Sequence, residues 1–250
     1  MQNEVRLLAG FIADASKIVG FTGAGISTES GIPDFRSKGG LWDRFTPVYY
    51  QEFIEDEEKR RLYWQRKIEM WQSLRNARPN QGHLFLAELH RRGKLQGLIT
   101  QNIDGLHEKA GVPREKIVRI HGTNSEIICL TCGRIISAAQ VMDRLKPDDP
   151  PPRCAECGGL VKPNTISFGQ NLNTEELERA EKLALTCDLM LCFGSTLLVY
   201  PAAGFPAQAA ERGARLAIVT LSETPLDGLA DVVIRSPIGE TVDALLNAFG

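Results

Sequence analysis

Apolar residues in this chain are gathered in short runs that alternate with longer amphipathic segments. Six of these runs predict short buried strands. They are residues 17–23, 95–102, 116–122, 187–195, 214–221 and 231–236. Helical periodicity predicts helices between them, at residues 4–14, 83–93, 174–184 and 202–213. Fully apolar strands that alternate with helices indicate an α/β fold, here a Rossmann-like, doubly wound parallel sheet with helices on both faces.

Two segments interrupt this alternation. Residues 36–79 are polar and aromatic with a helical pattern, and residues 126–162 contain close cysteine pairs, a proline-rich stretch and few apolar side chains. We interpret both as insertions that form a smaller lobe, one a helical segment and the other a zinc-binding module. The Rossmann-like domain would then consist of residues 1–35, 80–125 and 163–250.

Composition and charge exclude several classes of protein. The 250 residues are 43% hydrophobic and 24% charged, as in an ordinary globular protein. A net charge of −2 gives no overall attraction to nucleic acid or to an anionic membrane. No apolar run is long enough to span a membrane, and the N-terminus lacks a signal-peptide pattern. We therefore expect a cytoplasmic protein with reduced cysteines, no direct nucleic-acid binding and no membrane association.

Four cysteines have the spacing of a zinc site. Two C-x2-C pairs are separated by twenty-one residues, and their members are Cys129, Cys132, Cys154 and Cys157. This spacing is typical of a tetrahedral site with four thiolate ligands. Disulfides or free thiols are the alternative, which the expected reducing compartment disfavours. Four protein ligands leave no position for a substrate, so the zinc should be structural.

A glycine turn follows the first predicted strand. Gly23, Ala24 and Gly25 are small enough for the backbone to approach a pyrophosphate. The dinucleotide pattern G-x-G-x-x-G is incomplete, because Thr28 stands at the third glycine position. By itself the turn is compatible with dinucleotide binding or with tight packing alone.

A second polar cluster, TQNIDGLH at residues 100–107, follows another predicted strand. The carboxyl ends of strands are where open α/β sheets bind ligands. A capping network on a loop is the alternative interpretation. For His107 we expect a structural role with a hydrogen-bonded ring.

Seven motifs occur along the chain in a set order. They are GAGIS, ESGIPDFR, TQNIDGLH, an isolated HG, the four cysteines, GSTLLVYPAA and TPLD. Together they resemble the sirtuins, the family of NAD-dependent protein-lysine deacylases, and in particular its bacterial members. The resemblance extends over residues 17–228. It implies a Rossmann-like domain and a small zinc-bearing lobe, with NAD as co-substrate and an acyl-lysine protein or peptide meeting in the cleft between them.

The resemblance also implies contacts to NAD. On the first turn and the loop after it, the implied contacts are Gly23, Ala24, Gly25, Ser27, Asp34, Phe35 and Arg36. On the second cluster, the residues that would line the nicotinamide pocket and the ribose are Gln101, Asn102, Ile103 and Asp104. Gly194 and Ser195 would bind the adenosine half. Thr220 stands where the family usually has an asparagine that contacts the adenosine ribose.

For catalysis, the resemblance implies that His121 of the HG motif is the general base, assisted by Asn102 and Asp104. An imidazole is suited to take a sugar-hydroxyl proton near neutral pH. The acyl oxygen would attack the nicotinamide ribose and release nicotinamide. His121 would then activate a ribose hydroxyl, and the products would be free lysine and O-acyl-ADP-ribose.

Two further segments are implied in substrate binding. Phe168, Gly169 and Gln170 belong to a stretch that pairs with the substrate backbone as an added strand, and Gln170 replaces the usual glutamate. Tyr63 and Arg66 have the Y-x-x-R spacing that reads the distal carboxylate of malonyl- or succinyl-lysine in some sirtuins. The alternative is a helix on which Tyr63 packs and Arg66 is solvated.

We expect a protein-lysine deacetylase. The alternatives within the family are a desuccinylase, demalonylase or longer-chain deacylase that uses Tyr63 and Arg66, or a mono-ADP-ribosyltransferase on the same scaffold. From another class, a zinc module that binds nucleic acid or protein would leave GAGIS, QNID and HG without a role. A dehydrogenase is disfavoured by the missing third glycine.

Overall fold

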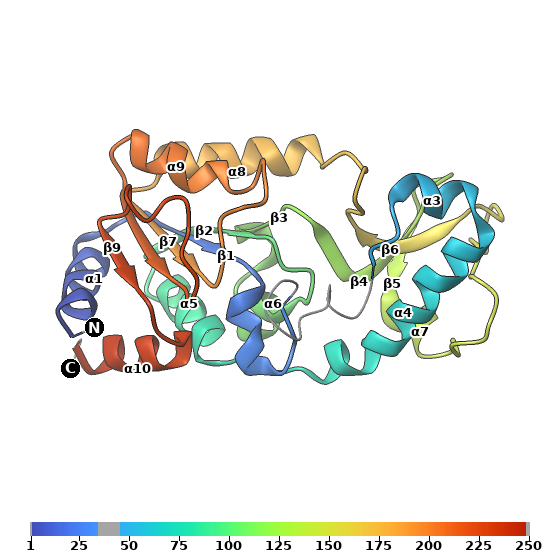
Figure 1. Ribbon diagram of the computed structural model, residues 1–250, viewed down its shortest axis with the longest axis horizontal. Helices are drawn as coiled ribbons and strands as arrows, with labels where there is room; N and C mark the ends of the chain where they lie inside the picture. The colour runs from blue at the N-terminus through green and yellow to red at the C-terminus, as the bar shows by residue number, and fades with distance from the viewer. Residues whose placement is uncertain (1, 35–45, 249–250) are drawn as a thin grey trace.

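The computed structural model describes residues 2–34 and 46–248. Its larger part is built on a six-stranded sheet with the order β3-β2-β1-β7-β8-β9, in which all neighbours are parallel (Figure 1). The strands are β1 (Ile18–Thr22), β2 (Leu95–Thr100), β3 (Ile117–Arg119), β7 (Leu189–Phe193), β8 (Arg215–Val219) and β9 (Val232–Ile234). The strand order reverses next to β1, so the predicted doubly wound α/β sheet is confirmed.

Helices cover both faces of this sheet (Figure 1). On one face lie α1 (Gln2–Asp14), α5 (Gln81–Arg91) and α10 (Ile238–Ala248), and on the other α8 (Thr174–Thr186) and α9 (Gly204–Glu211). Successive strand residues point to opposite faces. Accordingly, Ile18 joins the core under α1, whereas Val19 and Phe21 join the core under α8 and α9. Short helical segments at the strand ends complete the domain: η1 (Ala24–Ser30), α6 (Leu106–Ala110) and η2 (Arg114–Lys116).

A smaller lobe contains a second, antiparallel sheet with the order β5-β4-β6. Its strands are β4 (Gly122–Cys129), β5 (Ile135–Ser137) and β6 (Val161–Thr165), and its helices are α3 (Tyr50–Glu55), α4 (Glu57–Asn76) and α7 (Ala138–Met142). Phe53, Tyr63, Trp64 and Ile127 are buried together in its core. β4 and β6 extend beyond the boundaries at 126 and 162, and the division of the chain into domains stays a prediction.

One predicted strand is too long. The apolar run at 116–122 forms β3 only as far as Arg119, and His121 lies in a turn before β4. Gly122 has φ +76°, and a Cβ there would lie 2.0 Å from the carbonyl oxygen of Asn164 on β6. Only glycine fits this position, where the chain leaves one sheet and enters the other. Apolar periodicity does not register such a change of sheet.

The four cysteines of the zinc motif lie together in the small lobe. Their sulfur atoms are all within 4.8 Å of one another. The Cys129–Cys157 sulfurs are 3.6 Å apart and the Cys132–Cys154 sulfurs 3.8 Å apart. Zinc–sulfur bonds of about 2.3 Å in a tetrahedron require sulfur atoms about 3.8 Å apart. These residues therefore fit one Zn²⁺, which would join the turn after β4 to the loop before β6.

Two histidines are buried together below the ends of β1 and β2. The rings of His83 on α5 and His107 on α6 have centroids 4.9 Å apart, and Nε2 of His107 lies 2.9 Å from the Thr22 hydroxyl. Burial lowers the pKa of His107 to about 3. Burial, together with the neighbouring His107, lowers the pKa of His83 to about 2. Both rings are therefore neutral, as expected for a structural His107.

Among the described residues, no helix combines the length and the hydrophobicity needed to span a bilayer.

Loss of one zinc ligand should unfold the small lobe. We expect about one zinc per chain. We expect Cys132→Ser to lose the metal and melt at a lower temperature, because the ion joins the turn after β4 to the loop before β6. Metal analysis and calorimetry measure both effects. Cys187→Ser, outside the cluster, is the control. A Cys132→Ser protein with unchanged zinc content and melting temperature would contradict the assignment.

The buried histidines should make the protein sensitive to mild acid. Below pH about 6.5, an unfolded histidine binds a proton that the folded ring does not, so the free energy of unfolding falls by up to about 1.4 kcal/mol per pH unit for each ring. We expect the free energy of unfolding of His107→Gln, measured with urea, to fall less steeply between about pH 6.5 and 4 than that of the wild type. His90→Gln, at a half-exposed position on α5, controls for the loss of a histidine. An unchanged slope in His107→Gln would refute this account.

Candidate functional site

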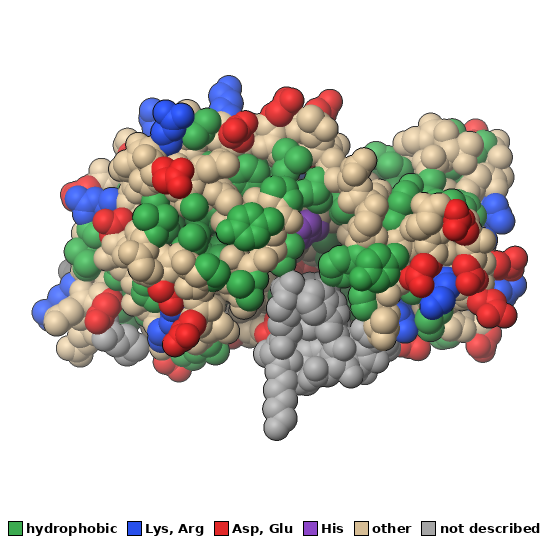
Figure 2. Space-filling model, turned by 45° about the horizontal axis from the view of Figure 1, so that its top comes forward, with side chains coloured by type: hydrophobic (Ala, Val, Ile, Leu, Met, Phe, Trp, Pro, Cys, Tyr) green, Lys and Arg blue, Asp and Glu red, His purple; other side chains and the backbone are tan. Residues whose placement is uncertain are grey.

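The site lies at the carboxyl ends of β1, β2 and β7, where the strand order reverses. Figure 2 shows a hollow between the two lobes at this level, with hydrophobic side chains on both of its sides. In a parallel sheet this is the edge at which loops from neighbouring strands converge. The two polar motifs predicted from the sequence follow β1 and β2, and the GST motif follows β7.

Three glycines bring the turns after β1 and β7 into direct contact. The Gly25 amide donates to the Gly194 carbonyl at 2.8 Å, and a Cβ on Gly23 or Gly25 would lie 2.8 Å from the same oxygen. Gly194 has φ +63°, and a Cβ there would lie 2.2 Å from the amide nitrogen of Ile26. The glycines are therefore required by packing. Gly23 and Gly194 are buried, and the amides of all three glycines donate to backbone carbonyls.

Ser195 joins the ends of β2 and β7. Its hydroxyl accepts from Nε2 of Gln101 at 2.9 Å and from the backbone amide of Leu197 at 3.2 Å. Two of the predicted cofactor contacts, from segments far apart in the sequence, are thus hydrogen-bonded to each other. Thr220 lies near this edge: the amide of Gly194 donates to the carbonyl of Val219, the residue before it.

Asn102, Ser27 and Asp104 form a buried polar network. Nδ2 of Asn102 donates to the Ser27 hydroxyl at 3.2 Å and to the Gly23 carbonyl at 3.1 Å. The Ser27 hydroxyl donates to Oδ2 of Asp104 at 2.7 Å, and the Leu106 amide donates to Oδ1 at 2.9 Å. Burial raises the pKa of the Asp104 carboxyl, against the effect of these bonds. The network fixes the side chains that were predicted to line the nicotinamide ribose.

One member of this network, His83, was not predicted from the sequence. Its Nε2 lies 3.4 Å from the Ser27 hydroxyl, and its Nδ1 lies 3.0 Å from Oδ1 of Asn80, which caps α5. The available signal was a histidine near the start of an otherwise apolar helix face. His83 supports Ser27 from below the site.

His121 stands in the turn between β3 and β4 and is half-buried. Its Nδ1 lies 3.1 Å from the carbonyl oxygen of Gln101. A carbonyl only accepts, so Nδ1 carries the proton and the lone pair of the neutral ring is on Nε2. This is the tautomer that a general base requires.

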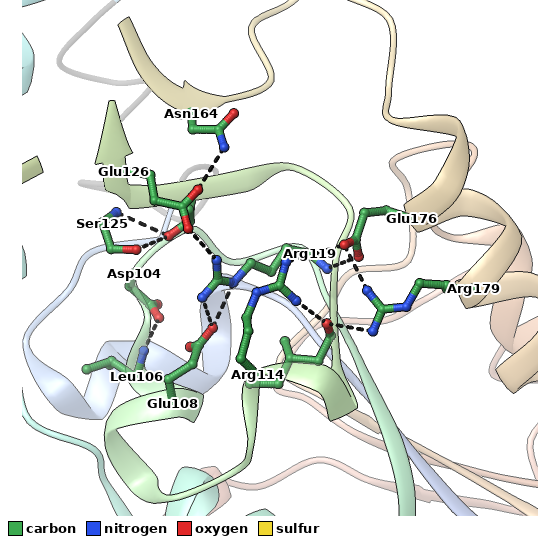
Figure 3. Close-up of polar contacts among 12 residues, drawn as sticks. Asp104, Leu106, Glu108, Arg114, Arg119, Ser125, Glu126, Asn164, Glu176 and Arg179 are labelled. Carbon is green, nitrogen blue, oxygen red and sulfur yellow. Dashed lines mark hydrogen bonds and ion pairs between the residues drawn. The ribbon is translucent and has the colours of Figure 1, made fainter. Parts of the chain in front are cut away.

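A network of charged side chains holds the turn that carries His121 (Figure 3). The Arg119 guanidinium donates to Glu108 of α6 at 2.7 Å and to Glu126 of β4 at 3.3 Å. Glu126 accepts from Asn164 of β6 at 2.8 Å, and the Arg119 amide donates to Glu176 of α8 at 2.8 Å. Arg119 is therefore bonded to α6 and α8 of the large domain and to Glu126 of β4, which in turn bonds Asn164 of β6.

A small pocket opens beside the network of Ser27, Asn102 and Asp104. It is lined by Ala24, Ser27, Ile32, Pro33, Met70, Leu74, Asn102, Ile103, Asp104 and Asn124. Its volume is about 30 Å³, room for no more than about two water molecules. A larger planar group therefore enters only if part of this lining moves apart.

The segment predicted to bind the substrate backbone lies at the edge of the small sheet. β6 has a strand neighbour, β4, on one side only among the described residues. After it, the Phe168 ring lies 5.9 Å from Tyr49, and Gly169 has φ +79°. The side chain of Gln170 accepts from the Ser167 amide at 3.1 Å and from Nζ of the buried Lys162 at 3.4 Å. Gln170 thus closes the turn.

Tyr63 and Arg66, the pair predicted to read an acyl carboxylate, contact different parts of the chain. The Tyr63 ring is buried 4.9 Å from Phe53, and burial raises its pKa to about 12, with Thr165 and Ser167 near the hydroxyl acting against the shift. Arg66 is half-buried and donates to the carbonyl of Thr46. Tyr63 therefore packs as the helix-face alternative requires.

Of the remaining predicted contacts, Asp34 is half-buried at the end of the described segment after η1. Phe35 and Arg36 lie outside the described residues.

Comparison with known proteins identifies the family. Residues 23–201 match the model of the Sir2 family. The chain is 45% identical over 242 residues to "NAD-dependent protein deacetylase 1" of Bradyrhizobium diazoefficiens, covering 97% of this chain and 95% of the relative. It is also 45% identical to "NAD-dependent protein deacetylase" of Rhodopseudomonas palustris, with 97% and 96% covered.

A solved complex described as "Sir2-p53 peptide-NAD+" has a TM-score of 0.84 and 33% identity, with 98% of each chain covered. The resemblance to the sirtuins predicted from the motifs is confirmed. The chain belongs to the Sir2 family.

Proposed function

We propose that this protein is an NAD-dependent protein-lysine deacetylase that releases nicotinamide and O-acetyl-ADP-ribose. The observation that carries this proposal is the placement of His121. Its ring is bonded to the backbone of Gln101 on the NAD side, and its turn leads into β4, the neighbour of edge strand β6. A base at this position is next to both proposed substrates. The names of the curated relatives support the same activity.

NAD would lie along the strand ends. The pyrophosphate would lie against the turns of Gly23, Ala24, Gly25 and Gly194, where small residues allow a close approach. Gln101 and Ser195, already hydrogen-bonded to each other, would contact ribose hydroxyls. Asp34, Phe35, Arg36 and Thr220 are proposed as flanking contacts.

The nicotinamide end would face Asn102, Ile103 and Asp104. A carboxylate accepts from an amide N–H, and the bond is stronger in a buried setting. Asn102 is held by Ser27 and the Gly23 carbonyl, so it can position the ribose without rearrangement. His121, with the lone pair on Nε2, would accept the ribose hydroxyl proton.

The acyl-lysine peptide would add a strand to the free edge of β6, with Phe168, Gly169 and Gln170 at the turn beside it. Main-chain hydrogen bonds then supply the affinity, which is compatible with varied peptide sequences. The four cysteines would hold a structural Zn²⁺ and take no part in the reaction. The division into a Rossmann-like domain and a small lobe, the absence of nucleic-acid binding and a cytoplasmic location complete the proposal.

Replacement of His121 separates catalysis from cofactor binding. We expect His121→Ala to lose deacetylation by at least about 100-fold, while NAD binding persists because the glycine turns and Ser195 are intact. Mass spectrometry of released O-acetyl-ADP-ribose measures deacetylation, and titration with NAD measures cofactor binding. His90→Ala is the control. Full activity in His121→Ala would overturn the role, and ADP-ribosylated protein as the main product would favour the transferase alternative.

A panel of acyl peptides tests the acyl preference. Tyr63 is packed in the core and Arg66 bonds a backbone carbonyl. We therefore expect acetyl-lysine to be preferred over succinyl-lysine, and Arg66→Ala to leave the ratio of the two rates unchanged. Arg61→Ala, at an exposed position of the same helix, is the matched control. A succinyl preference that disappears only in Arg66→Ala would establish the acid-reading alternative.

A further inference from the structure

Asn124 on β4 is a buried amide that lines the pocket beside Asp104. Its side chain is only 7% exposed. Its backbone amide donates to the carbonyl of Ile103 at 2.9 Å, so β4 of the small lobe is attached here to the loop that carries Asn102 and Asp104. No role was predicted for Asn124 from the sequence, although it lies three positions after His121.

Lys67 fixes the orientation of the Asn124 amide. Nζ of Lys67, on α4, lies 3.2 Å from Oδ1 of Asn124. An ammonium group only donates, so the amide oxygen must face Lys67 and the NH2 group must face away from it. Burial lowers the pKa of Lys67 to about 8. The amine therefore remains mostly protonated at neutral pH, and its charge also lies 5.5 Å from the centre of the Tyr63 ring.

The NH2 group of Asn124 has no acceptor within the described part of the chain. Nδ2 is buried, with no hydrogen-bond partner there. Buried polar groups are nearly always paired, since an unpaired donor forfeits its bonds to water. A buried donor that is held in place and lines a pocket is therefore a candidate for binding a ligand acceptor.

The rest of the pocket defines the chemistry of that ligand. Ile32, Met70 and Leu74 give it apolar walls, and Asp104 supplies a carboxylate acceptor. An acceptor and a donor between apolar walls are complementary to a planar group with a primary carboxamide, whose NH2 donates and whose carbonyl accepts. The nicotinamide of NAD is such a group.

We propose that Asn124 determines specificity for the nicotinamide carboxamide by donating Nδ2–H to its carbonyl oxygen, while Asp104 accepts from its NH2. This inference rests on the proposed function and adds a residue from the small lobe to the nicotinamide site. Because α4 supplies Lys67 as well as Met70 and Leu74, the same helix both orients the donor and forms one wall of the pocket.

Inhibition by the released product tests the contact directly. In the zinc-loaded, full-length protein, with NAD and an acetyl-lysine peptide, Asn124→Leu removes the donor and Asn124→Asp replaces it with an acceptor while keeping the contact to Lys67. We expect the inhibition constant of added nicotinamide to rise about threefold to tenfold in both variants, the worth of one hydrogen bond. Asn247→Leu, on the exposed side of α10, is the matched control.

The peptide KM separates this role from a structural one. A contact to the carboxamide raises the nicotinamide inhibition constant and leaves the KM for the acetyl-lysine peptide within about twofold of wild type. An unchanged inhibition constant in both variants, or a peptide KM that rises by the same factor, would overturn the inference. If Asn124→Leu does not fold, Asn124→Asp alone decides. A wild-type protein that releases no nicotinamide would refute the proposed function itself.

Discussion

The site depends on a backbone contact between two turns that are more than 160 residues apart in the sequence. Gly25 and Gly194 meet at a distance that leaves no space for a Cβ on either residue. This contact sets the separation of the β1 and β7 loops at the point where the strand order reverses. Because the residues in contact carry no side chains, the two turns pack at the closest approach that backbone allows.

Around this contact, polar side chains are buried but almost all are paired. Ser27 links Asn102 to Asp104, and Gln101 is bonded both to Ser195 and, through its carbonyl, to His121. Such networks are costly when incomplete and rigid when complete. Among the described residues, Nδ1 of His107 and Nδ2 of Asn124 are buried here without a hydrogen-bond partner. Of these two residues, Asn124 lines the pocket.

The two lobes are joined on either side of His121. Arg119 ties α6 and α8 to β4, and Asn124 ties β4 to the Ile103 loop. Between these two attachments lies His121. The small lobe therefore holds β6, Asn124 and the α4 wall of the pocket, and both of its attachments lie within a few residues of His121.

The sequence alone predicted a parallel sheet with helices on both faces, because fully apolar strands between amphipathic helices must bury both sides of the sheet. Spacing also determined the cysteine cluster, since two C-x2-C turns can supply four sulfurs to one ion. Motif order identified the family. The sequence did not reveal that the run at 116–122 changes sheet at Gly122, because that depends on the approach of Asn164 from β6.

Only the tertiary structure decided which side chains meet. His83 and Asn124 join the site through contacts with Ser27 and Ile103 that no local pattern encodes. Tyr63 and Arg66 share a helix spacing, yet one is packed against Phe53 and the other bonds Thr46. The physical reason is that periodicity reports which face of an element is buried, whereas the partner across that face is set by how distant segments pack.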